Sequence, residues 1–349
     1  MTRIIFGLSV LFLTLYSCNA PTENNHSVEE KDSVKIQAVE IDSLQFLTDQ
    51  IQNNTQKAEN WAQRALYFLR IGNVTDAVID MKSAVRLDSS NIIYRDYYAD
   101  LLVSTLDLET AMDNYEYILS VDSSNAKAYV GLGHIYALIN NPGLATGYLN
   151  KAYNIDPYLS EAYFLEGLIY RSDFYETGRE ESWERALSSF QTAVEQNPNY
   201  YSAYIEMGVM NNERGNPIAL EYFNTAINIA PKSIEAWYNK AMYFQNRQEL
   251  NSAKICYRTI LTIDSLYPES YYNQGYIQLV YEKNNDSAIY FFEKTVALDS
   301  LHFKGYNNLG LANEYNGNIE KAKINYRKSI EINPDFKLAK DNLHIVNKE

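Results

Sequence analysis

Hydrophobic and polar residues follow the period of an α-helix along most of the chain. In the stretch AWYNKAMYF, residues 236–244, spacings of three and four place Trp237, Ala241 and Phe244 on one helix face. Asn239 lies on another face. Similar stripes recur between short turns that carry Gly or Asn, such as RIGN, ERGN and YNGN. The pattern therefore predicts an all-α chain made of paired helices.

Two columns of small residues repeat with a period near 34. The first column has spacings of 34, 34, 34, 41, 33, 34 and 35, and it contains Ala65, Ala99, Gly133, Gly167, Gly208, Ala241, Gly275 and Gly310. The second is always alanine: Ala77, Ala111, Ala145, Ala186, Ala219, Ala253, Ala288 and Ala322. Small residues at these positions let the two helices of a hairpin approach closely. Because one hairpin cannot bury its apolar stripe alone, neighbouring hairpins are expected to stack into a solenoid.

These columns resemble the tetratricopeptide repeat, with an aromatic residue, then Gly or Ala, then Tyr or Phe, then Ala, then Pro. The resemblance implies a right-handed α-solenoid of about eight helical hairpins over residues 58–336. Residues 337–349 are expected to form a C-terminal cap helix. The fourth unit carries about seven extra residues around 172–182, which predict either an extended turn or a lengthened first helix. This insertion is read either as a tolerated surface feature or as a contact loop.

The N-terminus is typical of an export signal. Arg3 precedes an apolar run of 13 residues, which is shorter than the roughly 20 that span a bilayer. The run ends in LYSC, which resembles the lipobox of bacterial lipoproteins, although Tyr16 is bulkier than the residue usual there. The resemblance implies a signal peptide over residues 1–17 and lipidation of Cys18, with the outer membrane as destination. The alternative is an ordinary signal peptide with a chance cysteine. The polar, acidic stretch that follows predicts a flexible tether over 18–57, with a possible short helix at 44–52.

The charge and the rare reactive residues exclude several functions. A net charge of −14 argues against a nucleic-acid backbone as partner. The two cysteines make neither a disulfide framework nor a zinc cluster, and the four histidines lack metal-ligand spacing. No GxSxG motif or glycine-rich phosphate loop occurs. We therefore expect no catalysis, no cofactor and no metal.

The resemblance places binding in a concave groove lined by the first helix of each unit. In the last three units, the residue two after the aromatic is asparagine, whose amide both donates and accepts hydrogen bonds. This run resembles the asparagine ladder of other repeat superhelices, although asparagine is also simply frequent in this column. The predicted peptide-binding residues are Asn239, Asn273, Asn308, Tyr238, Tyr272, Tyr276, Met242 and Tyr315. For each tyrosine and methionine, packing between adjacent first helices is an equal alternative.

Two classes of function fit these features. The first is a lipid-anchored scaffold or adaptor of the bacterial cell envelope that binds a protein or peptide segment, either transiently or as a permanent accessory subunit. The second is a glycan-binding outer-membrane lipoprotein, because tyrosine-rich surfaces stack on sugars. Outer-membrane glycan receptors of the starch-utilisation type also contain tetratricopeptide-like helices. Those receptors carry large irregular insertions, however, and the insertion of about seven residues here argues against this second class. Periplasmic and outward-facing orientations both stay open.

Overall fold

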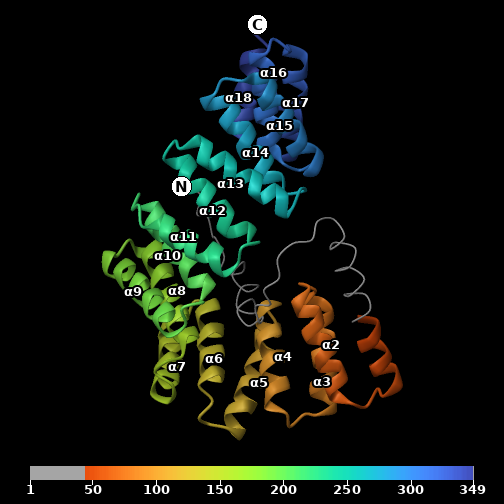
Figure 1. The fold of residues 1–349 in the computed structure, drawn as a ribbon, viewed down its shortest axis with the longest axis vertical. Helices are drawn as coiled ribbons and strands as arrows, with labels where there is room; N and C mark the ends of the chain where they lie inside the picture. The colour runs from red at the N-terminus through yellow and green to blue at the C-terminus, as the bar shows by residue number, and fades with distance from the viewer. Residues whose placement is uncertain (1–43, 349) are drawn as a thin grey trace. The chain divides into compact units, whose positions relative to one another are not determined.

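The computed structural model describes residues 44–348, and all regular structure in that range is helical (Figure 1). The described chain divides into two compact units, the first ending at Ala203 and the second beginning at Tyr204. The prediction of an all-α chain of stacked helical hairpins is confirmed. The expected signal peptide, Cys18 and the tether up to residue 43 lie outside the described residues.

The first unit contains four antiparallel hairpins preceded by a helix over residues 44–53. The hairpins are formed by α2 (Ala58–Arg70) with α3 (Val74–Leu87), α4 (Ile92–Ser104) with α5 (Leu108–Val121), α6 (Ala126–Leu138) with α7 (Pro142–Ile155), and α8 (Ser160–Thr177) with α9 (Glu180–Gln196).

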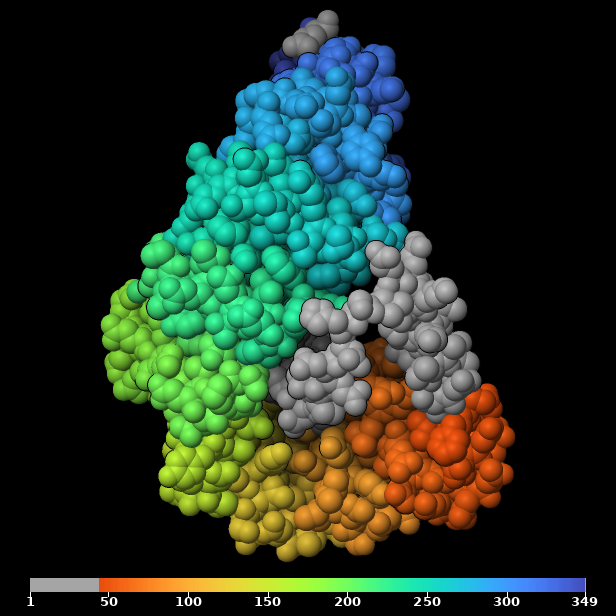
Figure 2. Space-filling view, viewed as in Figure 1, coloured from red at the N-terminus to blue at the C-terminus, as the bar shows by residue number. Residues whose placement is uncertain are grey.

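The second unit contains four more hairpins and a final helix. They are α10 (Tyr201–Glu213), whose first residues belong to the first unit, with α11 (Ala219–Ile229), α12 (Ile234–Asn246) with α13 (Leu250–Ile263), α14 (Pro268–Tyr276) and its continuation η3 (Ile277–Tyr281) with α15 (Asn285–Leu298), and α16 (Phe303–Tyr315) with α17 (Ile319–Ile332). Helix α18 (Lys337–Val346) packs on α17. Within each unit, successive hairpins form a continuous surface in the space-filling view (Figure 2).

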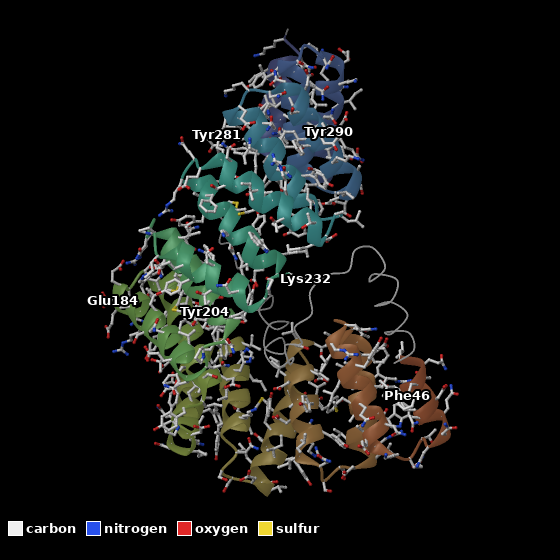
Figure 3. All side chains as sticks on the ribbon, viewed as in Figure 1. Phe46, Glu184, Tyr204, Lys232, Tyr281 and Tyr290 are labelled. Atoms are coloured by element: carbon white, nitrogen blue, oxygen red, sulfur yellow. The ribbon has the colours of Figure 1, made fainter. Side chains whose placement is uncertain are left out.

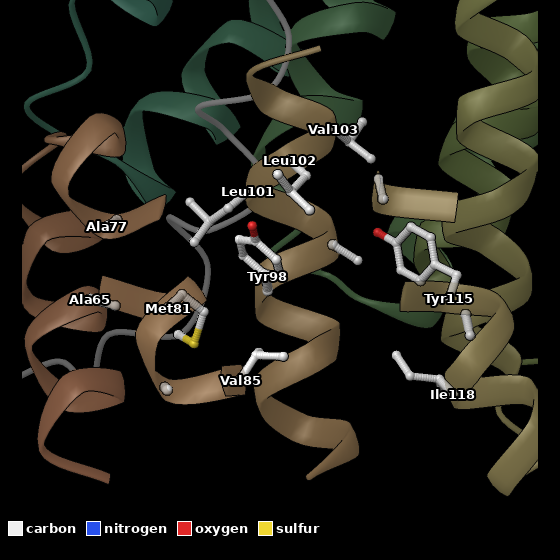
Figure 4. Close-up of a cluster of buried hydrophobic side chains, with 14 of the residues drawn as sticks. Ala65, Ala77, Met81, Val85, Tyr98, Leu101, Leu102, Val103, Tyr115 and Ile118 are labelled. Atoms are coloured by element: carbon white, nitrogen blue, oxygen red, sulfur yellow. The ribbon is translucent and has the colours of Figure 1, made fainter. Parts of the chain in front are cut away.

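Each hairpin core pairs a small residue with a large one. The eight alanines of the second column are fully buried, and the residue four positions after each is large and at most 1% exposed: Met81, Tyr115, Leu149, Phe190, Phe223, Tyr257, Phe292 and Tyr326. Figure 4 shows Met81 and Tyr115 in the core of the first unit. Four glycines of the first column lie against the aromatic ring of this large residue, at Gly167, Gly208, Gly275 and Gly310. Glycine is required there because an added Cβ would lie within 3.0 Å of the ring.

Every hairpin turn contains one residue in the left-handed region. Four of these are glycines, and the others are Leu106, Asn140, Gln248 and Lys283, with φ between 54° and 62°. Left-handed backbone is unfavourable for residues with a Cβ, particularly for Leu106. The packing of the two helices therefore determines the turn conformation even where no glycine is present.

The fourth hairpin shows where the extra residues of the insertion lie. Helix α8 has 18 residues and α9 has 17, whereas α6 and α7 have 13 and 14. The turn between α8 and α9 is short, with Gly178 at φ 72°. The insertion thus lengthens both helices, and of the two forms expected, the lengthened first helix is closer to the structure than the extended turn.

A second irregularity lies in the seventh hairpin. Gly275 and Ala288 are 13 residues apart, where most hairpins have 12 between the two small columns. The structure accommodates the extra residue as a π-helical segment over Ile277–Tyr281. Such segments are rare, and they are frequent at functional sites.

Candidate peptide-binding surface of the C-terminal repeats

The eight predicted binding residues lie on three successive first helices of the second unit. Tyr238, Asn239 and Met242 are on α12, Tyr272, Asn273 and Tyr276 are on α14, and Asn308 and Tyr315 are on α16. The same helical phase repeats because each helix packs on its neighbour in the same register. Their burial and hydrogen bonds nevertheless differ, and these differences separate packing residues from exposed ones.

Asn273 joins two first helices. Its side chain is 6% exposed, and its amide nitrogen donates to the carbonyl oxygen of Glu269 at 2.9 Å and to the hydroxyl of Tyr238 at 3.4 Å. Both amide hydrogens are therefore used inside the protein. Asn273 supports the contact between α12 and α14, and its amide hydrogens are not available to a ligand.

Asn308 forms the corresponding bond one repeat later. Its amide nitrogen donates to the Tyr272 hydroxyl at 3.1 Å, and its carbonyl oxygen accepts from Asn307 at 3.0 Å. Asn307, which is 1% exposed, in turn accepts from Asn342 of α18 at 3.0 Å. A chain of hydrogen bonds thus runs from Asn342 of the cap helix to Tyr272 of α14. Sequence reasoning missed Asn307, because nothing in the helical phase of α16 distinguishes it as buried.

Asn239 differs from the other two asparagines. Its side chain is half-buried, and among the described residues its amide has no hydrogen-bond partner within bonding distance. The equivalent of Tyr238 and Tyr272 in the preceding hairpin is Ile205, which has no hydroxyl to accept a bond. Asn239 is therefore the one of these three asparagines whose amide nitrogen and carbonyl oxygen are both without a bond within the described residues.

Tyr238, Tyr272 and Met242 are partly committed to packing. The Tyr238 ring meets Tyr257 edge-on at 6.2 Å, and the Tyr257 hydroxyl lies 3.3 Å from the Met242 sulfur. Tyr272 packs on His302 at 4.8 Å. Burial raises the pKa of Tyr272, and the hydrogen bond from Asn308 partly opposes this. These side chains are half-buried, so each offers only part of its surface to a ligand.

The other two predicted tyrosines are more accessible. Tyr315 is 60% exposed near the end of α16. Tyr276 is half-buried and lies 6.2 Å from Tyr281, with the two rings edge-on. Tyr281 was not predicted; it is 38% exposed and lies at the surface of the second unit (Figure 3). The π-helical segment brings these two rings together because it changes the side-chain phase after Tyr276.

The chemistry of this surface is that of recognition. It offers aromatic and thioether contact area and one amide that both donates and accepts. Within residues 44–348, no three His, Cys, Asp or Glu side chains converge as a metal site requires. No helix in the same range is long and apolar enough to cross a membrane.

Comparison with family models identifies the repeats. Two models described as tetratricopeptide repeat match residues 126–158, 234–265 and 303–336. These segments coincide with the third, sixth and eighth hairpins. The chain contains tetratricopeptide repeats. Two of the three matched repeats carry residues of the candidate surface, Asn239 in one and Asn308 in the other.

Known proteins are similar to this chain over most of its length, at low sequence identity. The chain is 22% identical over 276 residues to the mitochondrial import receptor subunit TOM70 of Homo sapiens and 21% identical over 284 residues to that of Rattus norvegicus. Each match covers 79% of this chain and 40% of the relative, so the chain spans about two fifths of these relatives.

Solved structures show the same fold. The crystal structure of the APC/C hetero-tetramer Cut9–Hcn1 matches 92% of this chain and 60% of that chain, with a TM-score of 0.56 and 15% identity. The human IFIT1 dimer with m7Gppp-AAAA matches 85% of this chain and 68% of that chain, with a TM-score of 0.55 and 18% identity. At this identity the likeness extends to the fold alone.

Proposed function

We propose that this protein is a non-catalytic scaffold or adaptor that binds a protein segment on the first helices of its last repeats. The observation that carries the proposal is the half-buried Asn239, whose amide has no partner among the described residues, beside the partly exposed Met242 and Tyr238. An unpaired side-chain amide can hydrogen-bond a peptide backbone whatever the peptide sequence. The neighbouring apolar surface supplies contact area.

The comparisons support the general class of function, which is protein binding by a repeat scaffold. Tetratricopeptide repeats match three segments, and the relatives are named as receptor subunits. The chain spans two fifths of those relatives, so the partner of this protein is a separate question.

The binding experiment uses the full chain as bait in detergent-solubilised extract of the native host. Asn239→Ala removes the available amide, and Asn251→Ala, an exposed asparagine on the second helix α13, is the matched control. We expect a partner that is captured by the parent and by Asn251→Ala and is depleted by Asn239→Ala. Equal capture of the partner by both variants would contradict the proposal that the first helices of these repeats form the binding surface.

We also propose that the protein is held at the bacterial cell envelope, most simply the outer membrane, by lipid on Cys18. The support is the apolar run that ends in LYSC. Several acyl chains on one residue anchor firmly, because each buried CH₂ contributes about 0.8 kcal/mol. Detergent-phase partitioning of the parent and of Cys18→Ser tests this. The parent is expected in the detergent phase and the variant in the aqueous phase, and aqueous partitioning of the parent would contradict lipidation.

A further inference from the structure

The last two helices carry an excess of positive charge on an acidic protein. Residues 319–348 contain seven Lys or Arg side chains and four Asp or Glu side chains, whereas the whole chain has a net charge of −14. Two of these four carboxylates are already paired, because Lys323 lies 3.2 Å from Glu320 and Lys328 lies 2.7 Å from Glu331. The other five cations of this segment are exposed and have no ion pair within the described residues: Lys321, Arg327, Lys337, Lys340 and Lys348.

Helix α18 combines these lysines with exposed aliphatic side chains. Leu338 and Ile345 are 52% and 54% exposed, and their spacing of seven residues places them on the same side of the helix. Ala339 and Val346, which face the preceding hairpin, are fully buried. The three lysines of residues 337–348 are exposed, and Asp341 is the one acidic residue in this segment. Terminal helices of repeat arrays need a polar outer face, so the two aliphatic side chains depart from a purely solvating cap.

The outer face of α18 does not fit a further hairpin, whether from this chain or from a second copy. One repeat after Tyr306 and Gly310, the aromatic and small columns are occupied by Lys340 and His344. The second helix of each hairpin packs a large side chain against the small residue, and His344 is not small. The partner of this face is therefore not another repeat packed in the manner of the first eight.

The kind of cation favours an extended negative surface over a single carboxylate. Four of the five unpaired cations are lysines, which act as point charges, and the planar fork of arginine occurs once, at Arg327. Lysines beside exposed aliphatic side chains on one helix are typical of helices that bind anionic lipid surfaces. Salt screens exposed charges that are more than about 8 Å apart, so the acidic remainder of the chain does not cancel this local attraction.

We propose that α18 binds an anionic lipid surface, with Leu338 and Ile345 in the headgroup region and its lysines beside the lipid phosphates. Lys321 and Arg327 of the adjoining helix α17 add to the positive potential. The proposal rests on the proposed location at the cell envelope, which brings a lipid surface within reach, but it does not require lipid on Cys18. It adds a second membrane contact near the C-terminal end of the chain.

The test measures the contact of α18 with vesicles directly. The full chain carries Cys18→Ser and Leu338→Cys, and the new thiol is labelled with NBD, a fluorophore whose emission rises in a lipid interface. Cys256 is 2% exposed and is therefore protected from the label. Ile79→Cys, at a residue of α3 that is 55% exposed, carries the same label as the control for position. The vesicles contain either phosphatidylglycerol and phosphatidylcholine or phosphatidylcholine alone.

We expect the emission from position 338 to rise with the anionic vesicles at low salt and to stay unchanged with phosphatidylcholine alone. Lys337→Glu/Lys340→Glu should weaken vesicle binding at least tenfold. Lys82→Glu/Lys232→Glu changes the net charge by the same amount at two exposed lysines elsewhere and should leave the binding unchanged.

The aliphatic contact is tested in the same titration. Ile345→Ser should weaken vesicle binding several-fold, whereas Ile255→Ser, at an isoleucine of α13 that is 58% exposed, should not. Equal losses in these two variants would overturn the assignment of Ile345 to the headgroup region.

The proposal is overturned if the emission from position 338 does not respond to anionic vesicles, if the label at position 79 responds equally, or if both double lysine variants lose the same affinity. A response to polyglutamate without a response to vesicles would assign this face to an acidic protein segment and would also overturn the proposal. Detergent-phase partitioning tests the lipid on Cys18 by itself, and the vesicle experiment uses Cys18→Ser, so the two membrane proposals can fail separately.

Discussion

Gly167→Ala tests the packing rule of the hairpins most directly. An added Cβ at Gly167 would lie 2.5 Å from Cε1 and 2.6 Å from Cδ1 of Phe190, which is fully buried. Since carbon atoms pack best at about 3.5–4.0 Å, the ring must move by about 1 Å in a close-packed core. Overpacking of this kind costs about 1–3 kcal/mol, and replacing a helical glycine by alanine returns about 0.5–1 kcal/mol.

The same substitution at Gly147 separates the steric contribution to the stability change from the effect of helix propensity. Gly147 also lies inside a helix of the first unit, and a Cβ there would meet nothing within 4 Å. Gly147→Ala is therefore expected to stabilise the protein by about 0.5–1 kcal/mol. The free energy of unfolding of the two variants should differ by about 1–3 kcal/mol, with Gly167→Ala the less stable.

Urea unfolding of both variants gives the overall difference. Because repeat arrays can unfold in parts, hydrogen exchange of α8 and α9 should accompany it, with faster exchange there in Gly167→Ala. The double variant Gly167→Ala/Phe190→Met reproduces the pair of Ala65 and Met81 in the first hairpin and should recover part of the loss. Equal stabilisation by Gly147→Ala and Gly167→Ala would refute the assignment of Gly167 to the contact with Phe190.

Three further predictions follow from buried polar groups. Asn307→Ala breaks the hydrogen-bond chain to the cap helix and should cost about 1–3 kcal/mol, with faster hydrogen exchange in α18; unchanged exchange there would contradict the link. Burial raises the pKa of Tyr267 to about 12, so the stability it contributes is full below pH 10 and is lost as the pH rises toward 12. Because this group is half-buried, the free energy of unfolding should fall by less than about 1.4 kcal/mol per pH unit in that range. Urea titrations at several pH values should show a weaker pH dependence of the free energy of unfolding for Tyr267→Phe than for the parent. Arg64→Met removes the guanidinium that lies 2.6 Å from the carboxylate of Asp80, which is 2% exposed. Thermal unfolding should show that the free energy of unfolding falls by about 3 kcal/mol, because a buried charge is left without its partner. Adding Asp80→Leu should restore most of this loss.

Periodicity in the sequence predicts the paired helices, because every hairpin uses the same small residues at the same spacing. The conformation of the turns is not predictable in the same way. Leu106, Gln248 and Lys283 have no intrinsic preference for the left-handed region, and the adjoining helices impose it.

The roles of the asparagine column were also only partly accessible from the sequence. Helical phase places Asn239, Asn273 and Asn308 on the same face of their helices. Whether the amide is available depends on the residue that the preceding hairpin presents, which is a tyrosine for Asn273 and Asn308 and an isoleucine for Asn239. Such pairings join residues 34 to 36 positions apart, so a pattern within one helix does not contain them.

The departures from the regular period are where distinct surfaces arise. A regular hairpin uses its apolar stripe to pack against its neighbours, and identical hairpins present similar surfaces. The lengthened α8 and α9 line a cavity together with the turn between α6 and α7. The single extra residue of the seventh hairpin produces the π-helical segment that brings Tyr276 and Tyr281 together. These two irregularities therefore give the fourth and seventh hairpins surface features that follow from a change in length and not from the packing pattern that all eight hairpins share.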